Sequence, residues 1–203
     1  MALQMSNTLQ MSTLAFTPRP PLSDADTTLA QRLALGEAEA FEQLVALYQP
    51  RVSRLAFRLL GWNGDVEDVV QDVFVAALSK GKTFRGDASL WTWLTAVTLN
   101  LCRSRLRRAA LIRRLTGGLL RPENREASAA DAGLVEDETS GRVRSAVAAL
   151  PPRDREVIVL YYLEERPVAE ISELIGITTN TVDVRLHRAR RKLKDLLGES
   201  HTE

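Results

Sequence analysis

The side chains best suited to bind a ligand lie in a basic segment near the C-terminus, Pro167 to Leu193. A single acid, Asp183, interrupts the positive charge of its second half, which is carried by Arg185, Arg188, Arg190, Arg191, Lys192 and the adjoining Lys194. Guanidinium and ammonium groups at this density bind phosphates, and polar side chains at the start of such a helix reach base edges in the major groove. The segment therefore predicts binding of duplex DNA, with a solvated amphipathic helix as the alternative.

The pattern of this segment is typical of a helix-turn-helix. Ile171, Leu174 and Ile175 give a short apolar face, Gly176 breaks the helix, and Thr178 is a good N-cap for the next one. A single buried stripe then follows at helical spacing, formed by Val182, Leu186, Ala189 and Leu193. The stripe would hold the second helix against the domain and leave its charged surface free for DNA.

The residues expected to contact duplex DNA divide by role. Asp183 can accept a hydrogen bond from a cytosine amino group, whereas Arg188 is expected to meet phosphate. We hypothesise that losing Arg185 relaxes sequence choice, whereas losing Arg188 weakens binding to all sequences alike. The full set is Thr178, Thr179, Asn180, Thr181, Asp183, Arg185, Arg188, Arg191 and Lys192.

A second group of side chains suits single-stranded nucleic acid. The loop 80–88 is basic and contains Phe84 and Gly86, and the predicted helix 89–115 continues it with Trp91, Trp93 and several arginines. Bases stack on aromatic rings while phosphates meet cations. We predict that Trp93 belongs to the core, because Leu94 and Val97 continue its face, and that Trp91 is the accessible stacking residue.

The predicted helix 65–79 has an acidic face. Its apolar face is formed by Val66, Val69, Val70, Val73 and Ala77. Asp65, Asp68 and Asp72 lie opposite, and no basic residue occurs within the helix. The helix dipole explains acids in the first turn but not Asp72, two turns in. A basic protein partner is one explanation, and a solvated face is the other.

Composition excludes several classes of function. The 203 residues are 45% hydrophobic and 26% charged with a net charge of +1, so the basic segments are local. Cys102 is the only cysteine, which rules out a disulfide framework and fits a reducing cytoplasm, and two histidines form no usual zinc site. No apolar run approaches the ~20 residues of a membrane helix, and the N-terminus does not resemble a signal peptide. We expect no metal, cofactor or membrane insertion.

The chain is predicted to be all-α, with two small helical domains joined by a flexible acidic linker. Helices are expected at 27–35, at 37–60 with a kink at Pro50, at 65–79 and at 89–115, then from about Arg142 and, after Pro151 and Pro152, through 153–165 into the helix-turn-helix. The proposed boundaries are a disordered tail at 1–26, a first domain at 27–116, the linker at 117–140, a second domain at 141–197 and a tail at 198–203.

Several motifs together resemble one family. These are DVEDVVQDVFVAAL, FRGDASLWTWL, NLCRSRLRR, LPPRDREVIVLYYL and IGITTNTVDVRLHRARRKL, in this order. The set resembles the extracytoplasmic-function group of bacterial RNA polymerase sigma factors, which retains conserved regions 2 and 4, and the likeness covers 28–115 and 141–197. Departures occur at Leu90–Trp91, Leu99, Ser104 and Asp183–Val184, so promoter preferences are not carried over from relatives.

The resemblance implies partners for each surface. It implies that the acidic helix docks on the clamp coiled coil of the polymerase's largest subunit through Asp65, Glu67, Asp68, Gln71 and Asp72. It implies melting of the −10 element and capture of a flipped base by Lys80, Lys82, Phe84, Arg85, Gly86, Asp87, Trp91, Asn100, Arg103 and Arg107. The second domain would read the −35 element and sit on the flap of the second-largest subunit, the linker would occupy the RNA exit channel, and an anti-sigma factor would be a further partner.

Three other functions compete with this one. A helix-turn-helix activator of the response-regulator type would bind duplex DNA without polymerase, but it needs a receiver domain, and residues 28–115 lack alternating strands. A helical interaction protein without nucleic acid leaves the arginine-rich helices unexplained. An enzyme is disfavoured, because the sequence has no glycine-rich phosphate loop and neither His187 nor His201 has an evident nucleophile partner.

Overall fold

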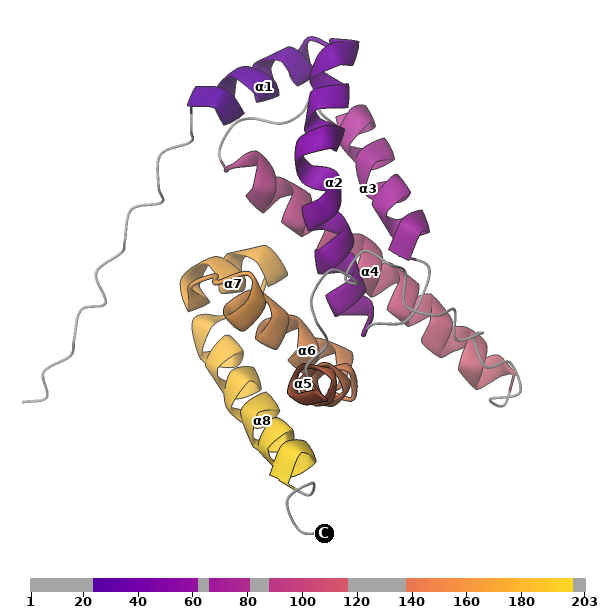
Figure 1. Cartoon of the computed structure of the whole chain (residues 1–203), viewed down its shortest axis with the longest axis vertical. Coiled ribbons are helices and arrows are strands. Elements are labelled where there is room, and N and C mark those ends of the chain that lie inside the picture. The colour runs from indigo at the N-terminus through magenta and orange to yellow at the C-terminus, as the bar shows by residue number, and fades with distance from the viewer. Residues whose placement is uncertain (1–23, 62–65, 81–87, 117–137, 199–203) are drawn as a thin grey trace, which may run out of the picture.

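The computed structural model describes residues 24–61, 66–80, 88–116 and 138–198, and its regular elements in these ranges are all helices (Figure 1). The prediction of an all-α chain is confirmed. Several predicted features lie outside the described residues: the tail 1–23, Asp65, the loop residues 81–87, the linker residues 117–137 and the tail 199–203. None of the described helices is both long enough and apolar enough to span a membrane.

The first bundle consists of α1 (Asp24–Ala34), α2 (Ala38–Leu60), α3 (Val66–Lys80) and α4 (Leu90–Leu115). Helices α2, α3 and α4 pack against one another, and α1 lies against α2. The predicted apolar face of α3 is confirmed, since its five residues are all buried. Helix α2 continues through Pro50 to Leu60, and Gly61 ends it in the left-handed conformation with φ 81°.

The second bundle consists of α5 (Glu138–Ala148), α6 (Pro152–Ile158), the π-helical turn η3 (Val159–Leu163), α7 (Val168–Ile175) and α8 (Thr179–Gly198). Helix α5 begins at Glu138, earlier than expected, so the end of the predicted linker is helical. The regular helix predicted over 153–165 is wrong in its second half, where the backbone widens into η3. The tight turn after it includes Glu165 at φ 52°.

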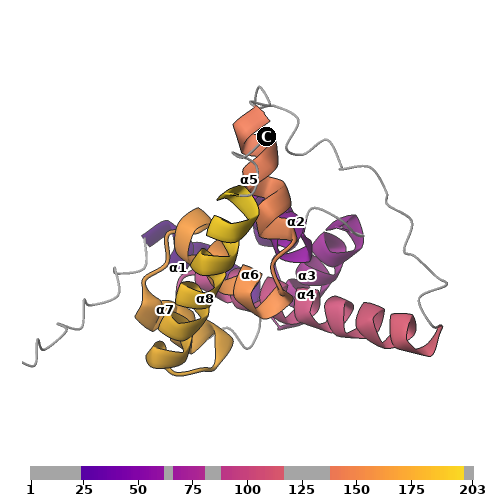
Figure 2. The same ribbon diagram turned by 90° about the horizontal axis from the view of Figure 1, so that it is seen from below.

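The two bundles pack directly on each other. Helix α2 contacts α6 and η3, and α4 contacts α7. Their buried apolar side chains form one continuous cluster, from Leu29 in α1 to Ala189 in α8. The C-terminal half of α4 projects past both bundles (Figure 1, Figure 2). The sequence pattern predicts two domains on a linker but not their packing, because the contacts between the bundles join residues far apart in the chain.

Candidate nucleic-acid interface

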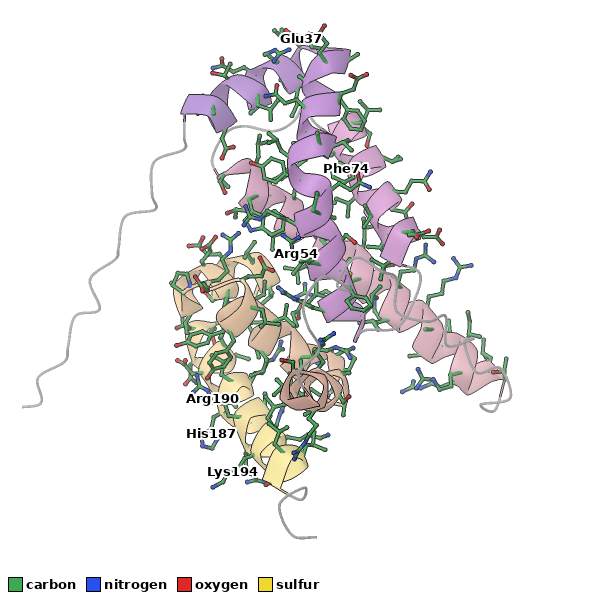
Figure 3. All side chains as sticks on the ribbon, viewed as in Figure 1. Glu37, Arg54, Phe74, His187, Arg190 and Lys194 are labelled. Carbon is green, nitrogen blue, oxygen red and sulfur yellow. The ribbon has the colours of Figure 1, made fainter. Side chains whose placement is uncertain are left out.

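Helix α8 is anchored on one side and open on the other. Val182, Leu186 and Ala189 are buried as predicted, and Leu193 is half-buried against the core. The hydroxyl of Thr178 accepts a hydrogen bond from the Thr181 backbone N–H at 3.2 Å, which confirms the predicted N-cap. The labelled side chains of His187, Arg190 and Lys194 lie on the side of α8 that faces away from the first bundle (Figure 3).

The side chains predicted to reach base edges stand at the start of this open surface. Thr179, Asn180 and Asp183 are exposed, and Arg185 is half-buried. Farther along α8, Arg191 and Lys192 are exposed, as a phosphate contact requires. Among these duplex candidates, Thr178 and Thr181 have a structural role as well, since their hydroxyls share a hydrogen bond of 2.8 Å at the cap.

Arg188 is not a simple phosphate ligand. Its Nε donates to Asp154 Oδ2 at 2.9 Å, and its Nη2 donates to the other carboxylate oxygen. Asp154 is buried in α6, whereas the Arg188 side chain is 60% exposed. Hydrogen bonding to Asp154 raises the pKa of the Arg188 guanidinium above its ordinary value. Arg188 therefore has a structural role beside the predicted phosphate contact, because it ties α8 to α6.

Arg190 is a further basic residue of α8, for which the sequence predicted no specific contact. Its Nε donates to the Tyr162 hydroxyl at 2.8 Å, and its guanidinium lies 5.5 Å and 5.6 Å from the ring centroids of Tyr161 and Tyr162. The two tyrosines belong to η3, so the π-helical turn positions this cation. The adjacent tyrosines were visible in the sequence, but their distance from Arg190 in the chain gave no signal of the contact.

The two tryptophans of α4 are buried in the reverse of the predicted order, although Trp93 also packs against the core cluster as predicted. Trp91 is 7% exposed and lies parallel to Tyr48, with ring centroids 6.3 Å apart. The Arg51 guanidinium covers it at 4.1 Å from the ring centroid. Trp93 is only half-buried. The prediction is wrong because α4 turns Leu90, Trp91 and Leu94 toward α2, so Trp91 packs in the core and cannot stack on a base in this arrangement.

The remaining single-strand candidates are distributed along α4. Asn100 and Arg107 are exposed. Arg103 is half-buried, and its Nε donates to Glu156 Oε1 of α6 at 2.7 Å. Lys80 ends α3, while Lys82, Phe84, Arg85, Gly86 and Asp87 lie outside the described residues. The structure thus brings Asn100, Arg103 and Arg107 onto neighbouring turns of one helix.

The acidic face of α3 is present but partly neutralised. Glu67, Asp68, Gln71 and Asp72 are all exposed. The Arg105 guanidinium of α4 lies 3.2 Å from an Asp68 oxygen and 3.8 Å from an Asp72 oxygen. The expectation of an uncompensated face is therefore corrected, although exposed pairs of this kind contribute only about 0–1 kcal/mol. The face remains net acidic and open to a basic partner.

Among the described residues, no group of three or more His, Cys, Asp or Glu side chains is placed to hold a metal ion. The Cys102 thiol is buried, and burial, aided by the nearby Glu156 carboxylate, raises its pKa to about 12. A neutral, enclosed thiol is a packing group, not a nucleophile.

Comparison with known proteins decides the family. Residues 44–112 match the family "Sigma-70 region 2", and residues 140–193 match "Sigma-70, region 4". The chain is 31% identical over 172 residues to the extracytoplasmic-function (ECF) RNA polymerase sigma factor SigW of Bacillus subtilis, covering 81% of this chain and 92% of the relative. The chain belongs to the ECF sigma factors. As an ECF sigma factor it is an alternative sigma factor of bacterial RNA polymerase, and none of these similarities favours the activator alternative.

Other relatives extend the comparison. The sigma factor is 34% identical over 185 residues to CnrH of Cupriavidus metallidurans, covering 86% of this chain and 95% of the relative. A solved structure of CnrH in complex with the cytosolic domain of CnrY aligns with a TM-score of 0.61 at 33% identity, covering 87% of this chain and 99% of that one. The sigma factor RpoE of Bartonella quintana, solved with the anti-sigma factor NepR, aligns with a TM-score of 0.65 at 22% identity over 79% of this chain and 98% of that one, which shows the shared fold.

Proposed function

We propose that this sigma factor divides promoter recognition between two helices. Helix α8 reads the −35 element in duplex DNA, and α4 with the segment before it holds the single strand of the melted −10 element. The observation that carries the proposal is the open surface of α8, whose N-terminal polar side chains are exposed above a buried apolar stripe. This is the geometry with which a recognition helix enters a major groove.

The proposed contacts of α8 with DNA are of two kinds, sequence-specific and general. Asn180, Asp183 and Arg185 read base edges, since amide, carboxylate and guanidinium groups discriminate bases by their hydrogen-bond pattern. Arg191 and Lys192 neutralise phosphates and supply sequence-independent affinity. Arg188 contributes to the phosphate contact while it positions the helix through Asp154.

We assign binding of the melted −10 strand to α4. Asn100, Arg103 and Arg107 offer one amide and two cations along the helix, and the aromatic and basic residues of 80–87 precede it in the chain. Stacking and cationic contacts offset the few kcal/mol of unstacking that base flipping requires. Because Trp91 is enclosed, Phe84 becomes the main aromatic candidate.

The partners follow from the remaining surfaces. The exposed acids of α3 are proposed to dock on the clamp coiled coil of the largest polymerase subunit, and the second bundle on the flap of the second-largest subunit. The acidic linker is proposed to enter the RNA exit channel. The complex of CnrH with CnrY supports a protein regulator that binds this chain too, an anti-sigma factor. We propose that the protein acts in the cytoplasm, where promoter DNA and polymerase are found, and that catalysis belongs to the polymerase.

Reconstituted transcription tests the proposal. Core RNA polymerase is incubated with sheared genomic DNA of the source organism, with and without the sigma factor, and transcript 5′ ends are mapped. New discrete start sites that share −35 and −10 sequences are expected. Absence of new starts, together with failure to co-elute with core polymerase, would contradict the proposal.

A further inference from the structure

The open surface of α8 contains an exposed apolar side chain. Val184 lies in the second turn of α8 and is 56% exposed, and it belongs neither to the buried core cluster nor to the partly buried side chains packed against it. In the part of the chain that the structure describes, it is the one large apolar side chain of α8 that is exposed. Folding does not account for it, because valine is a weaker helix former than alanine and gains nothing from burial here.

Val184 stands opposite the stripe that anchors the helix. Val182 and Leu186, two residues before it and two residues after it, are buried. Side chains two residues apart point to nearly opposite sides of a helix, whereas those three or four apart share a face. Val184 therefore shares the outward face with Asn180 and His187, which are both exposed. His187 points away from the first bundle, so Val184 lies in the middle of the surface that a duplex would meet (Figure 3).

The turn that carries Val184 is unsuited to phosphate. The preceding residue, Asp183, is an exposed carboxylate, which repels phosphate, and valine has no hydrogen-bond donor on its side chain. The exposed cations Arg191 and Lys192 follow about two turns later. Because phosphates line the edges of the major groove and base edges form its floor, a helix held by these later cations presents the turn of Asp183 and Val184 to the bases.

An apolar side chain at this place favours one base. Among the four bases, thymine alone presents a methyl group in the major groove. A donor or acceptor that faced Val184 would lose its water without gaining a hydrogen bond, which is unfavourable. A thymine methyl group against the isopropyl group instead removes apolar surface of both partners from water. A single apolar side chain among polar ones is also too small for the patch that a protein partner requires.

We propose that Val184 is a specificity-determining residue that packs against the C5 methyl group of a thymine in the −35 element. The inference rests on the −35 role proposed above for α8 and adds to it the base and the chemical group that are recognised. It also gives consecutive residues different preferences, since the carboxylate of Asp183 suits the amino group of cytosine whereas Val184 suits thymine. The promoters of this sigma factor should therefore contain a thymine that cannot be exchanged without loss of affinity.

The base preference is tested by selection from random DNA. The full-length chain is assembled with core RNA polymerase and mixed with duplexes in which a window of consecutive base pairs is random, and the bound duplexes are sequenced. Val184→Ser removes the apolar group without changing helix propensity. It is expected to enrich the wild-type motif with one thymine position relaxed. The control, Val143→Ser, makes the same change at a 44% exposed valine of α5 and should retain that thymine.

The methyl group is tested on the DNA itself. In the best duplex of the wild-type selection, uracil replaces the thymine that Val184→Ser relaxes, which deletes only the C5 methyl group. In competition experiments read by fluorescence anisotropy, the wild type and Val143→Ser should bind the uracil duplex about fourfold more weakly, as expected for one buried methyl group. Val184→Ser should bind both duplexes equally. Replacement of each thymine in turn, with the wild-type chain alone, tests the contact even if the variant does not fold.

The outcomes separate this inference from the proposed function. If the wild-type complex enriches no sequence, the −35 role of α8 fails and the inference falls with it. If a motif is enriched but Val184→Ser enriches the identical motif, the −35 role stands and the thymine contact is overturned. Equal binding of uracil and thymine at every position overturns it as well. An equal loss of the thymine in Val143→Ser and Val184→Ser would assign the effect to the fold and would also overturn the contact.

Discussion

At the scale of single residues, Asp154 accepts two hydrogen bonds from one guanidinium, that of Arg188. Asp154 is buried, so little water is available to replace Arg188 as its hydrogen-bond partner. A cationic side chain on a recognition helix can thus hold the helix in place as well as bind phosphate. The sequence showed the charge of Arg188 but not the acid, which lies 34 residues earlier.

We expect Asp154→Asn to lower the free energy of unfolding by about 1–3 kcal/mol, because charge-assisted hydrogen bonds to a buried group are lost. Asp183→Asn, which alters an exposed acid of α8, is the control and should change stability by less than about 0.5 kcal/mol. Urea unfolding monitored by circular dichroism measures both. Equal stability of the two variants would show that the Arg188 contact has no structural weight.

The tryptophans make a second prediction at this scale. Trp91→Ala removes a ring enclosed between Tyr48 and Arg51, and we expect a loss of about 3–5 kcal/mol in unfolding free energy. Trp93→Ala should cost less, because Trp93 is half-buried. Trp91→Phe should recover part of the loss. The order is judged from urea midpoints, and a larger loss for Trp93→Ala would contradict the packing described here.

At the scale of elements, periodicity predicted most of the helices and their buried faces. The valines of α3 and the stripe of α8 are where the spacing put them, because one face of an amphipathic helix must find the core. Helical periodicity could not predict which of Trp91 and Trp93 is the more buried. Both neighbouring faces of α4 carry apolar residues, and the outcome depends on where α2 packs. Periodicity also missed η3, whose extra residue per turn leaves no mark in composition.

Helix α8 depends on its cap. We expect Thr178→Ala to lower the unfolding free energy by about 0.5–2 kcal/mol, because the Thr181 backbone N–H loses its acceptor. Thr178→Ser keeps an acceptor oxygen and should retain most of the stability. If Thr178 acted only in base contact, both variants would be as stable as the wild type in thermal unfolding and would differ only in affinity for −35 DNA.

At the scale of the whole molecule, the sequence predicted two helical units but not that they pack together. The residues that join the bundles include single charges such as Arg103 and Glu156, 53 positions apart, and no local sequence pattern pairs them. Their contact also reaches Cys102, whose thiol pKa is raised first by burial and then by the nearby Glu156 carboxylate. Stability at high pH therefore reports on the packing of both bundles.

Two buried groups link this packing to pH. The pKa of Cys102 rises from 9.0 to about 12, chiefly through burial and then through Glu156. The pKa of Tyr48 rises from 10.0 to about 12, through burial and then through its hydrogen bond to Asp26. Because both folded-state pKa values lie above the unfolded ones, the folded chain binds these protons more tightly. Their stabilising contribution is complete below pH 9 and is lost as pH rises toward 12.

We therefore expect the unfolding free energy to decline from about pH 9 to about pH 12, with each group contributing at most about 1.4 kcal/mol per pH unit within its own window. The double variant Cys102→Ala/Tyr48→Phe lacks both protons and should decline less steeply, although its stability at neutral pH is lower. Urea unfolding across this pH range measures the two slopes. Contributions from groups that the two proteins share cancel in the difference between the slopes. Parallel curves for the two proteins would mean that neither Cys102 nor Tyr48 is enclosed as described, and for Cys102 that the contact between α4 and α6 is looser than the one described.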